Sequence, residues 1–301
     1  MKLTILGCYS ATPRIAAHTT AQILETRGHV FLIDCGEGTQ MELRKNKIKF
    51  NQIKHIFISH LHGDHCFGLI GLISTFSLLN RETNLHIYGP KGLKELILVQ
   101  LKLSNSWINF ELIFHEIESF KSELIYEDDK LEVRTIPLDH RVYTNGYLFK
   151  EKPFDRKLDI DAAEANNIDV AYYRKLKQGE DVLNNDGILI SNSAVTSKGL
   201  VPKCYAFCSD TAYKEDIIPL INEVDVLYHE STFLEAHAKL CSKTKHSTAK
   251  QAATIAKKAK VGTLILGHYS SRYSDLEEFR TEASAIFKEV ELARDCKTFQ
   301  I

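Results

Sequence analysis

Four side chains of metal-binding type fall within six consecutive positions of this chain. They are His60, His62, Asp64 and His65, in the run Ser59-His-Leu-His-Gly-Asp-His65, which directly follows an apolar stretch. A strand alone would not gather all four, because successive side chains point to opposite faces. A loop that opens into a helix would, with His60 and His62 on one side of the extended part and Asp64 and His65 in the first helical turn. The run therefore predicts two adjacent metal ions rather than a chance polar loop.

Three further ligand candidates each follow a strand-like apolar stretch. They are His140, Asp210 and His268, and open α/β sheets present ligand-binding residues at such strand ends. A single histidine after a strand is more often a surface or capping residue, but the three together would complete two sites. Imidazole and carboxylate donors without a thiolate favour hydrolytic Zn²⁺, with Mn²⁺ or Fe²⁺ as alternatives.

Short apolar runs alternate with helical patterns along the chain and would position these residues. We expect strands at residues 2–6, 21–25, 30–33, 55–59, 85–88, 131–138, 204–209, 226–228 and 263–266, and helices at residues 67–79, 92–101, 248–259 and 276–288. This alternation predicts an α/β layered domain. Residues 67–79 are apolar nearly all round, which predicts a buried helix.

Residues 150–197 interrupt the alternation of strands and helices. The segment is polar and carries Asn and Asp clusters, so we interpret it as an inserted arm rather than a second core. The 301 residues otherwise fit one large domain.

The charge balance excludes a globally basic nucleic-acid-binding protein. Lys+Arg number 38 and Asp+Glu 39, which gives a net charge of −1, so any polyanion site must arise from local charge. Residues 239–260 contain seven lysines and no acidic residue, and residues 44–54 are also basic. Most charge runs are solvated helix faces; recruitment of a polyanion is the alternative.

Cysteine usage and the N-terminus favour a cytoplasmic chain. The seven cysteines include no Cys-x-x-Cys pair, unlike a secreted disulfide framework. The first residues lack a signal-peptide cleavage pattern, and no apolar stretch reaches the roughly 20 residues that cross a bilayer. We therefore expect no membrane partner.

The motifs together resemble the metallo-β-lactamase superfamily and, within it, the ribonuclease Z family of tRNA 3′-processing endonucleases. The superfamily resemblance rests on the order of Asp34, the run at residues 60–65, His140, Asp210 and His268. The family resemblance rests on Phe31-Leu-Ile-Asp-Cys-Gly-Glu-Gly-Thr-Gln40, His229-Glu-Ser-Thr232, His246-Ser-Thr248 and Gly267-His-Tyr-Ser-Ser-Arg-Tyr273. It implies a four-layer αββα sandwich over residues 1–301, with a flexible arm inserted at residues 150–197.

The resemblance also implies how the ligands divide between two Zn²⁺ ions per subunit. One ion would be held by His60, His62 and His140. The other would be held by Asp64, His65 and His268. Asp210 would bridge the two ions, and Asp34 would lie beside a ligand rather than act as one.

The same resemblance implies the catalytic residues. Asp64 would both bind a metal and accept a proton from the attacking water. The departing ribose 3′ oxygen needs a proton or a positive neighbour, and His246, oriented by Glu230, is the candidate. Without the family motif, His246 would be interpreted as a helix N-terminal residue with no chemistry. Arg272 would pair with a phosphate or form a surface salt bridge.

The implied substrate is a tRNA precursor, from which the 3′ trailer is removed to leave a 3′-hydroxyl on the tRNA and a 5′-phosphate on the trailer. The arm, with Lys175 and Lys177, would grip the tRNA, and in a homodimer one subunit's arm would serve the other's site. The stretch before Lys175-Leu-Lys-Gln-Gly179 lacks the Gly/Pro signature usual in the family, so a surface loop is the alternative for this segment.

Two other functions fit part of the pattern. A dinuclear-metal phosphodiesterase or arylsulfatase of the same superfamily, acting on small molecules, would share the ligands but need neither the arm nor the lysine-rich segment. A non-catalytic RNA-binding module with a remnant metal site would lack a ligand, and this sequence holds all seven.

Overall fold

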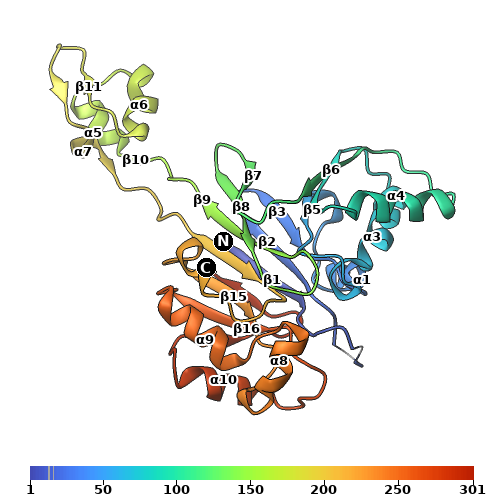
Figure 1. The fold of residues 1–301 in the computed structure, drawn as a ribbon. Helices are drawn as coiled ribbons and strands as arrows, with labels where there is room; N and C mark the ends of the chain where they lie inside the picture. Colours follow the sequence, from blue (N-terminus) through green and yellow to red (C-terminus); the bar gives the residue numbers. More distant parts are fainter. Residues whose placement is uncertain (13, 16) are drawn as a thin grey trace. The chain divides into compact units, whose positions relative to one another are not determined.

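The computed structural model describes residues 1–12, 14–15 and 17–301, and backbone proximity divides them into two units. Unit 1 comprises Met1–Glu127, Glu132–Phe149 and Cys204–Ile301. Unit 2 comprises Asp128–Leu131 and Lys150–Lys203. The two units are described separately below (Figure 1).

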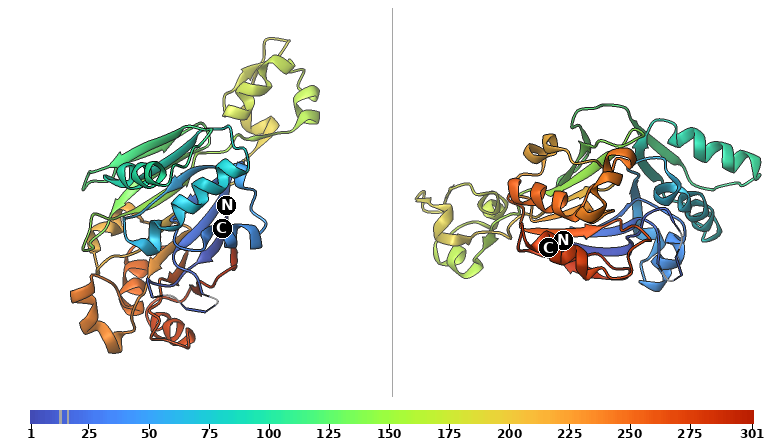
Figure 2. Two further views of the ribbon diagram at one scale, coloured as in Figure 1. Left: turned by 90° about the vertical axis from the view of Figure 1, so that its right-hand side faces the viewer. Right: turned by 60° about the horizontal axis from the view of Figure 1, so that its bottom comes forward.

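Two seven-stranded sheets form the centre of unit 1. The first has the order β18 (Thr298–Gln300), β1 (Lys2–Gly7), β2 (Ala21–Thr26), β3 (His29–Ile33), β4 (Ile53–Phe57), β5 (Leu85–Pro90) and β6 (Leu112–Ile117). Strands β3 to β6 run parallel, and β18, β1, β2 and β3 pair antiparallel. Because β18 pairs with β1, the two termini lie side by side, with the Ile301 amide donating to the Met1 carbonyl at 3.0 Å (Figure 2).

The second sheet carries most of the strand ends that bear predicted ligands. Its order is β17 (Val290–Leu292), β16 (Thr263–Gly267), β15 (Val226–Glu230), β14 (Cys204–Cys208), β9 (Asn145–Glu151), β8 (Leu131–Pro137) and β7 (Leu124–Glu127). Strands β14 to β17 are parallel, so their carboxyl ends share one edge.

Helices cover the outer faces of the two sheets and complete four layers (Figure 1). Helices α1 (Thr39–Lys45), α3 (Gly68–Leu78) and α4 (Leu93–Leu103) share an apolar core with the first sheet. Helices α9 (Ala249–Lys258) and α10 (Glu277–Ser284) pack on β15, β16 and β17, and α8 (Ala238–Thr244) precedes them. Between the sheets, Phe149 lies 5.5 Å from Phe31 and 5.3 Å from Phe57, centroid to centroid. The predicted αββα sandwich is confirmed.

Two predicted helices differ from the structure. The pattern at residues 67–79 becomes α3, which the short helix α2 (Gly63–Cys66) precedes. The prediction of a buried helix was wrong, because Phe67 is 55% exposed, Leu78 83% and Leu79 51%. The sheet covers only one side of α3, so an all-round apolar pattern leaves the other side in solvent. The helix predicted at residues 276–288 ends at Ser284.

The helix predicted from Thr248 onward is confirmed together with its cap. The Thr248 hydroxyl accepts from the Gln251 amide at 3.1 Å, and the Gln251 side chain accepts from the Thr248 amide at 2.9 Å. A capping box of this kind stabilises a helix by about 1 kcal/mol. It fixes the chain immediately after His246.

Across residues 1–12, 14–15 and 17–301, no helix has the length and apolar character needed to span a bilayer.

Unit 2 contains short elements around a small apolar cluster. They are β10 (Lys157–Leu158), α5 (Ile160–Ala165), η2 (Val170–Tyr172), α6 (Tyr173–Gln178), β11 (Val182–Leu183), β12 (Leu189–Ile190), α7 (Asn192–Val195) and β13 (Thr196–Ser197). The buried cluster consists of Ala163, Ile168, Leu176, Val182 and Val195. The insertion predicted at residues 150–197 therefore has a small core of its own, which its polar composition did not indicate.

Candidate metal centre

All seven predicted ligands lie just past the carboxyl end of a strand. His60 and His62 follow β4, and Asp64 and His65 form the first turns of α2. His140 follows β8, Asp210 follows β14, and His268 follows β16. Strands from both sheets thus bring residues 60 and 268 of the sequence to one place, as expected at the carboxyl edge of parallel strands.

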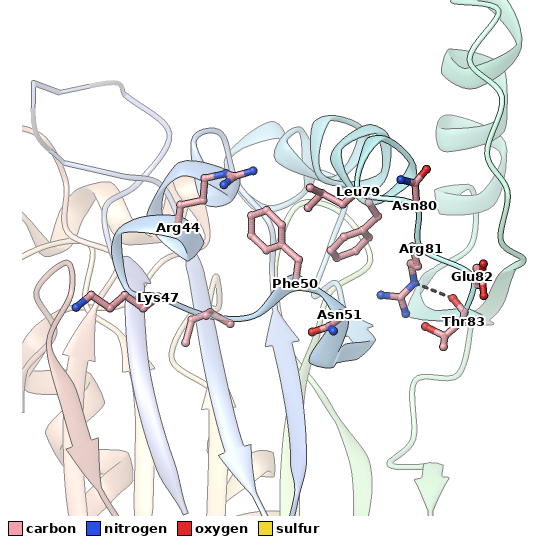
Figure 3. A pocket seen from close by; sticks show the side chains of 11 residues that line it. Arg44, Lys47, Phe50, Asn51, Leu79, Asn80, Arg81, Glu82 and Thr83 are labelled. Atoms are coloured by element: carbon pink, nitrogen blue, oxygen red, sulfur yellow. Dashed lines mark hydrogen bonds between the residues drawn. The ribbon is translucent and has the colours of Figure 1, made fainter.

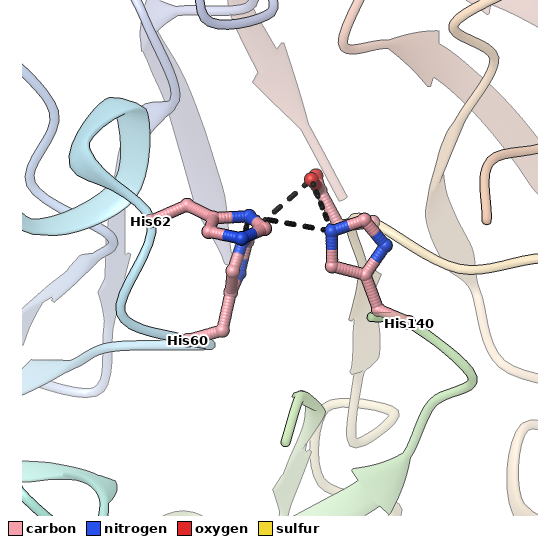
Figure 4. Close-up of side chains that lie close together, drawn as sticks. His60, His62 and His140 are labelled. Carbon is pink, nitrogen blue, oxygen red and sulfur yellow. Dashed lines mark hydrogen bonds and ion pairs between the residues drawn. The ribbon is translucent and has the colours of Figure 1, made fainter. Parts of the chain in front are cut away.

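The first donor group consists of His60, His62, His140 and Asp210. The His60 Nε2 atom lies 3.0 Å from His62 Nδ1, and His140 Nε2 lies 3.3 Å from the same atom. Asp210 Oδ2 is 3.6 Å from both His60 Nε2 and His140 Nε2. Figure 4 shows the imidazoles of His60, His62 and His140 close together at this place.

The second donor group consists of Asp64, His65, His268 and the other oxygen of Asp210. Asp210 Oδ1 lies 3.2 Å from His65 Nε2 and 3.1 Å from His268 Nε2. Asp64 Oδ2 lies 3.4 Å from each of the same two nitrogens. Asp210 thus offers one oxygen to each group, which is the geometry of a bridging carboxylate.

Hydrogen bonds outside the donor groups orient four of the imidazoles through their Nδ1 atoms. The partners are the Ser59 hydroxyl for His60 (3.0 Å), the Asp34 carboxylate for His65 (2.7 Å), the Lys245 carbonyl for His140 (2.9 Å) and the Thr232 hydroxyl for His268 (2.9 Å). Because a carbonyl or carboxylate only accepts, the Nδ1 atoms of His140 and His65 carry the protons. In the neutral form of each ring, the Nε2 atom then faces its donor group with a lone pair.

The donor groups fit divalent cations better than an arrangement of hydrogen bonds. His62 Nδ1 lies 3.0–3.3 Å from the Nε2 atoms of His60 and His140, and a cation between these nitrogens would accept a lone pair from each. The buried His65 Nε2 atom has no hydrogen-bond partner. Four donors placed tetrahedrally about zinc at 2.0–2.1 Å are about 3.3–3.4 Å apart, close to the separations in both groups. Within the described part of the chain, neither group includes a cysteine.

The carboxylates of the centre are ionised. Burial by itself would raise the pKa of Asp210, but the imidazoles of His268, His65 and His60 outweigh it and lower that pKa well below its usual value. The pKa of Asp64 is also lowered, because His65 and His268 offset its burial. The two carboxylates therefore supply negative charge to both donor groups.

The backbone of the centre is strained at three of its residues. Asp34, Asp210 and His268 have φ values of 56°, 61° and 59°, and a left-handed residue other than glycine costs on the order of 1–3 kcal/mol. Gly36 is required for a different reason, because a Cβ atom there would collide with the Thr19 side chain and the Asp64 carbonyl. The glycine lets the Asp34 loop approach the helix that carries Asp64.

Glu230 and His246 form a second polar pair beside the donor groups. The His246 Nδ1 atom lies 2.7 Å from Glu230 Oε1, and its ring lies 5.1 Å from His140 and 5.3 Å from His268. Burial by itself would lower the pKa of His246, but the Glu230 carboxylate outweighs it and raises that pKa to about 9. The structure thus brings together an imidazolium and the donor groups.

The predicted substrate contacts lie in two places. The exposed Arg272 has its guanidinium 6.0 Å from the Phe233 ring, and that ring is 6.3 Å from His246. Lys175 and Lys177 are exposed on α6 of unit 2 and belong to neither donor group.

The lysine-rich segment at residues 239–260 is partly neutralised by distant acidic residues. Lys245 pairs with Asp139 at 3.0 Å, Lys250 with Glu235 at 3.4 Å, and Lys258 with Glu215 at 2.6 Å. The local positive charge is therefore smaller than the count of seven lysines suggests.

Sequence reasoning predicted Asp34 beside a ligand, which is confirmed by its contact with His65, but it missed the other three orienting partners, Ser59, Thr232 and Lys245. Ser59 and Thr232 stand inside recognised motifs, so their position was a usable signal. The Lys245 carbonyl gave none, because any residue supplies a carbonyl, and its role depends on a left-handed turn with φ of 59°.

A surface cavity elsewhere in unit 1 offers no comparable chemistry. It has a volume of about 720 Å³, and Arg44, Lys47, Phe50 and Arg81 contribute to its lining (Figure 3). The Arg81 guanidinium already donates to three carbonyls at 2.7–2.9 Å. The residues that line the cavity include none of the two donor groups.

Comparison with known proteins gives matches along the whole chain. Ribonuclease Z of Bacteroides fragilis is 44% identical over 294 residues, which cover 98% of this chain and 97% of that protein. Ribonuclease Z of Cytophaga hutchinsonii is 45% identical and covers 100% of this chain and 96% of its own. Residues 1–154 match the family model described as Anti-Pycsar protein Apyc1.

Solved structures give the same picture for the fold. The crystal structure of human tRNase Z, short form, superposes with a TM-score of 0.74 at 27% identity, covering 100% of this chain and 99% of that one. The metallo-β-lactamase fold protein YhfI of Bacillus subtilis has a TM-score of 0.68 at 18% identity, covering 99% and 98%. The latter likeness concerns the fold alone.

Proposed function

The chain belongs to the ribonuclease Z family and, through residues 1–154, to the family of the Apyc1 model, and from this membership we infer its function. It is a tRNA 3′-processing endonuclease with a dinuclear metal centre. The ribonuclease Z matches extend beyond residue 154 to the strand ends that carry Asp210 and His268. This extent favours ribonuclease Z activity over a small-molecule phosphodiesterase or arylsulfatase.

We propose that the centre holds two zinc ions in each subunit. His60, His62 and His140 would hold one ion and Asp64, His65 and His268 the other, with Asp210 between them. The proposal rests on one observation above all: two groups of donors share the two oxygens of a single buried aspartate. Bound zinc would lower the pKa of water and neutralise charge at the scissile phosphate.

The side chains around the scissile bond would have distinct tasks. Asp64 would accept a proton from the attacking water while the water oxygen forms its bond to phosphorus. The bond from phosphorus to the ribose 3′ oxygen then breaks, and His246 would protonate that oxygen. Glu230, 2.7 Å from His246, would keep it protonated and oriented. The products would be a tRNA with a 3′-hydroxyl and a trailer with a 5′-phosphate.

We further propose that residues 150–197 form the tRNA-binding arm and that Arg272 contacts a substrate phosphate. Support for the arm comes from Lys175 and Lys177, which are exposed on the same short helix. Support for Arg272 comes from the Phe233 ring, which lies 6.0 Å from the Arg272 guanidinium and 6.3 Å from the His246 ring. In a homodimer, the arm of one subunit would serve the site of the other.

The function is tested by incubating the purified protein with a tRNA precursor that carries a 3′ trailer. We expect two products, mature-length tRNA and trailer, that disappear with a chelator and return with added zinc. The variant Asp64→Ala should not cleave but should still bind the precursor. A cleavage rate that changes neither when the chelator is added nor when zinc is restored would contradict a metal-dependent mechanism.

The shared-arm arrangement has its own test. Arm-deleted protein and Asp64→Ala protein should each be inactive on the precursor. Mixed under conditions that exchange subunits, they should regain part of the activity, because one subunit supplies the site and the other the arm. No regain, with mixed dimers present, would mean that each arm serves its own subunit.

A further inference from the structure

One hydroxyl group lies within hydrogen-bonding distance of both the Glu230 carboxylate and the imidazole of His268. This hydroxyl belongs to Thr232, which is 3% exposed. Its Oγ1 atom lies 2.7 Å from Glu230 Oε2 and 2.9 Å from His268 Nδ1. A carboxylate, a hydroxyl and an imidazole thus stand in line, and the far nitrogen of the imidazole faces the second donor group.

The directions of these hydrogen bonds are fixed by counting donors. Glu230 Oε1 accepts from the Thr211 amide at 2.9 Å and lies 2.7 Å from His246 Nδ1, and Oε2 accepts from the Thr232 amide at 3.0 Å. Each oxygen is therefore an acceptor, and the Thr232 hydroxyl must donate its single proton to Oε2. The hydroxyl oxygen is then left to accept, and only His268 Nδ1 is there to donate.

This assignment has a consequence for the metal. In the neutral ring with its proton on Nδ1, His268 offers the lone pair of Nε2 to a cation held between it and the Asp64 and Asp210 oxygens, which lie at 3.4 and 3.1 Å. The opposite tautomer would place a proton where a cation is to bind. Outer partners of this kind orient ligands and raise their basicity.

The first donor group shows the same arrangement. The Ser59 hydroxyl donates to Asp34 Oδ2 at 2.9 Å and lies 3.0 Å from His60 Nδ1. Each donor group therefore contains one imidazole whose tautomer is set by a hydroxyl, and each hydroxyl is itself polarised by a buried carboxylate.

We propose that Thr232 is a positioning residue that fixes the tautomer of His268 and joins the Glu230–His246 pair to one of the two metal sites. The proposal rests on the dinuclear centre proposed above. It requires the second donor group to lose affinity for its cation when the hydroxyl is removed, although Thr232 touches neither metal nor substrate.

The test uses Thr232→Val, which keeps the shape of the side chain and removes the hydroxyl, and Thr232→Ser, which keeps the hydroxyl. Zinc binding is measured on the full-length protein by competition with a chromophoric chelator. We expect Thr232→Val to weaken one of the two zinc ions by about 10- to 100-fold and Thr232→Ser to stay within about threefold of the wild type. Two unweakened zinc ions in folded Thr232→Val would overturn the proposal.

Thr135→Val is the matched control. Thr135 is fully buried, and its hydroxyl accepts from the Glu123 amide at 2.8 Å, but it belongs to neither donor group. Zinc affinity should be unchanged in this variant. An equal loss there would mean that any buried hydroxyl supports zinc binding through stability alone, which would also overturn the proposal.

A second measurement does not depend on whether Thr232→Val folds. In zinc-loaded wild-type protein labelled with ¹⁵N-histidine, the long-range ¹H–¹⁵N spectrum should show the His268 proton on Nδ1, assigned by its shift in Thr232→Ser. A proton on Nε2 would overturn the proposal. Neither experiment uses tRNA, so a wild-type protein that binds zinc but fails to cleave precursor would contradict the proposed function and leave this inference standing.

Discussion

Replacing Asp34 by Asn tests whether a residue outside the donor groups controls the affinity of one metal site. Asp34 Oδ1 accepts from the Ser59 amide at 2.7 Å, and Oδ2 accepts from the Ser59 hydroxyl at 2.9 Å and from His65 Nδ1 at 2.7 Å. All three donors point at a fully buried carboxylate. An amide has one accepting oxygen and one donating NH₂ group, so it matches only one side of this arrangement.

Either orientation of the new amide disturbs the centre. With the NH₂ group toward the Ser59 amide, two donors face each other. With the NH₂ group toward His65, the imidazole must accept at Nδ1 and carry its proton on Nε2, where the cation would bind. Loss of one charge-assisted hydrogen bond costs about 1.5–3 kcal/mol, which corresponds to about 10- to 100-fold in metal affinity.

The assay is a zinc titration against a chromophoric chelator, with the fold checked by circular dichroism. Asp34→Asn should weaken the ion of the second donor group, to which His65 belongs, more than the ion of the first donor group, because His60 contacts Asp34 only through the Ser59 hydroxyl. Asp295→Asn is the control, since Asp295 also holds an imidazole, that of His18 at 2.9 Å, outside both donor groups. Wild-type affinity for both ions in folded Asp34→Asn would refute the tautomer argument.

Three other variants test the remaining roles. His246→Ala should slow precursor cleavage by about 10²- to 10⁴-fold with an unchanged zinc content by elemental analysis, and loss of zinc would instead identify His246 as a ligand. Lys175→Glu combined with Lys177→Glu should raise the KM for the precursor and leave hydrolysis of a small aryl phosphodiester unchanged, whereas an equal loss on both substrates would make the arm structural. His55→Phe should change stability in acid: burial and neighbouring imidazoles lower the pKa of His55 to about 3, so only the unfolded chain takes up this proton below about pH 6.5. The free energy of unfolding should therefore fall by about 1–2 kcal/mol from pH 7 to pH 5, and urea unfolding should show a flatter pH dependence for His55→Phe; an unchanged one would contradict this origin.

The sequence predicted which side chains converge better than it predicted the elements around them. His140, Asp210 and His268 could be found because each directly follows an apolar run, and strand ends meet at one edge of a sheet. In the two large sheets, strands β6, β7, β9, β17 and β18 were missed. Of these, β6 and β7 are only half-buried and do not alternate cleanly. The core of the arm was missed for a related reason, because five buried side chains are too few to outweigh a polar composition.

What the sequence could not predict is how the imidazoles are held. A motif identifies which histidines converge, but the tautomer of each depends on a partner brought by the fold. For His140 that partner is the Lys245 carbonyl, 105 positions away, held in place by a left-handed turn. No pattern of side chains encodes a carbonyl, so only the folded chain reveals it.

The second sheet holds the strained backbone of the centre in place. Asp210 and His268 are left-handed residues directly after β14 and β16, and both side chains are almost fully buried. Such conformations persist only where the surrounding structure fixes them, and here parallel strands with wholly buried residues such as Phe207 and Leu266 do so. Because the strain is held by the sheet rather than by the ligands, the donor groups should keep their geometry when zinc is removed. A crystal structure of chelated protein in which Asp210 leaves the left-handed region would show that the metal, not the sheet, maintains the site.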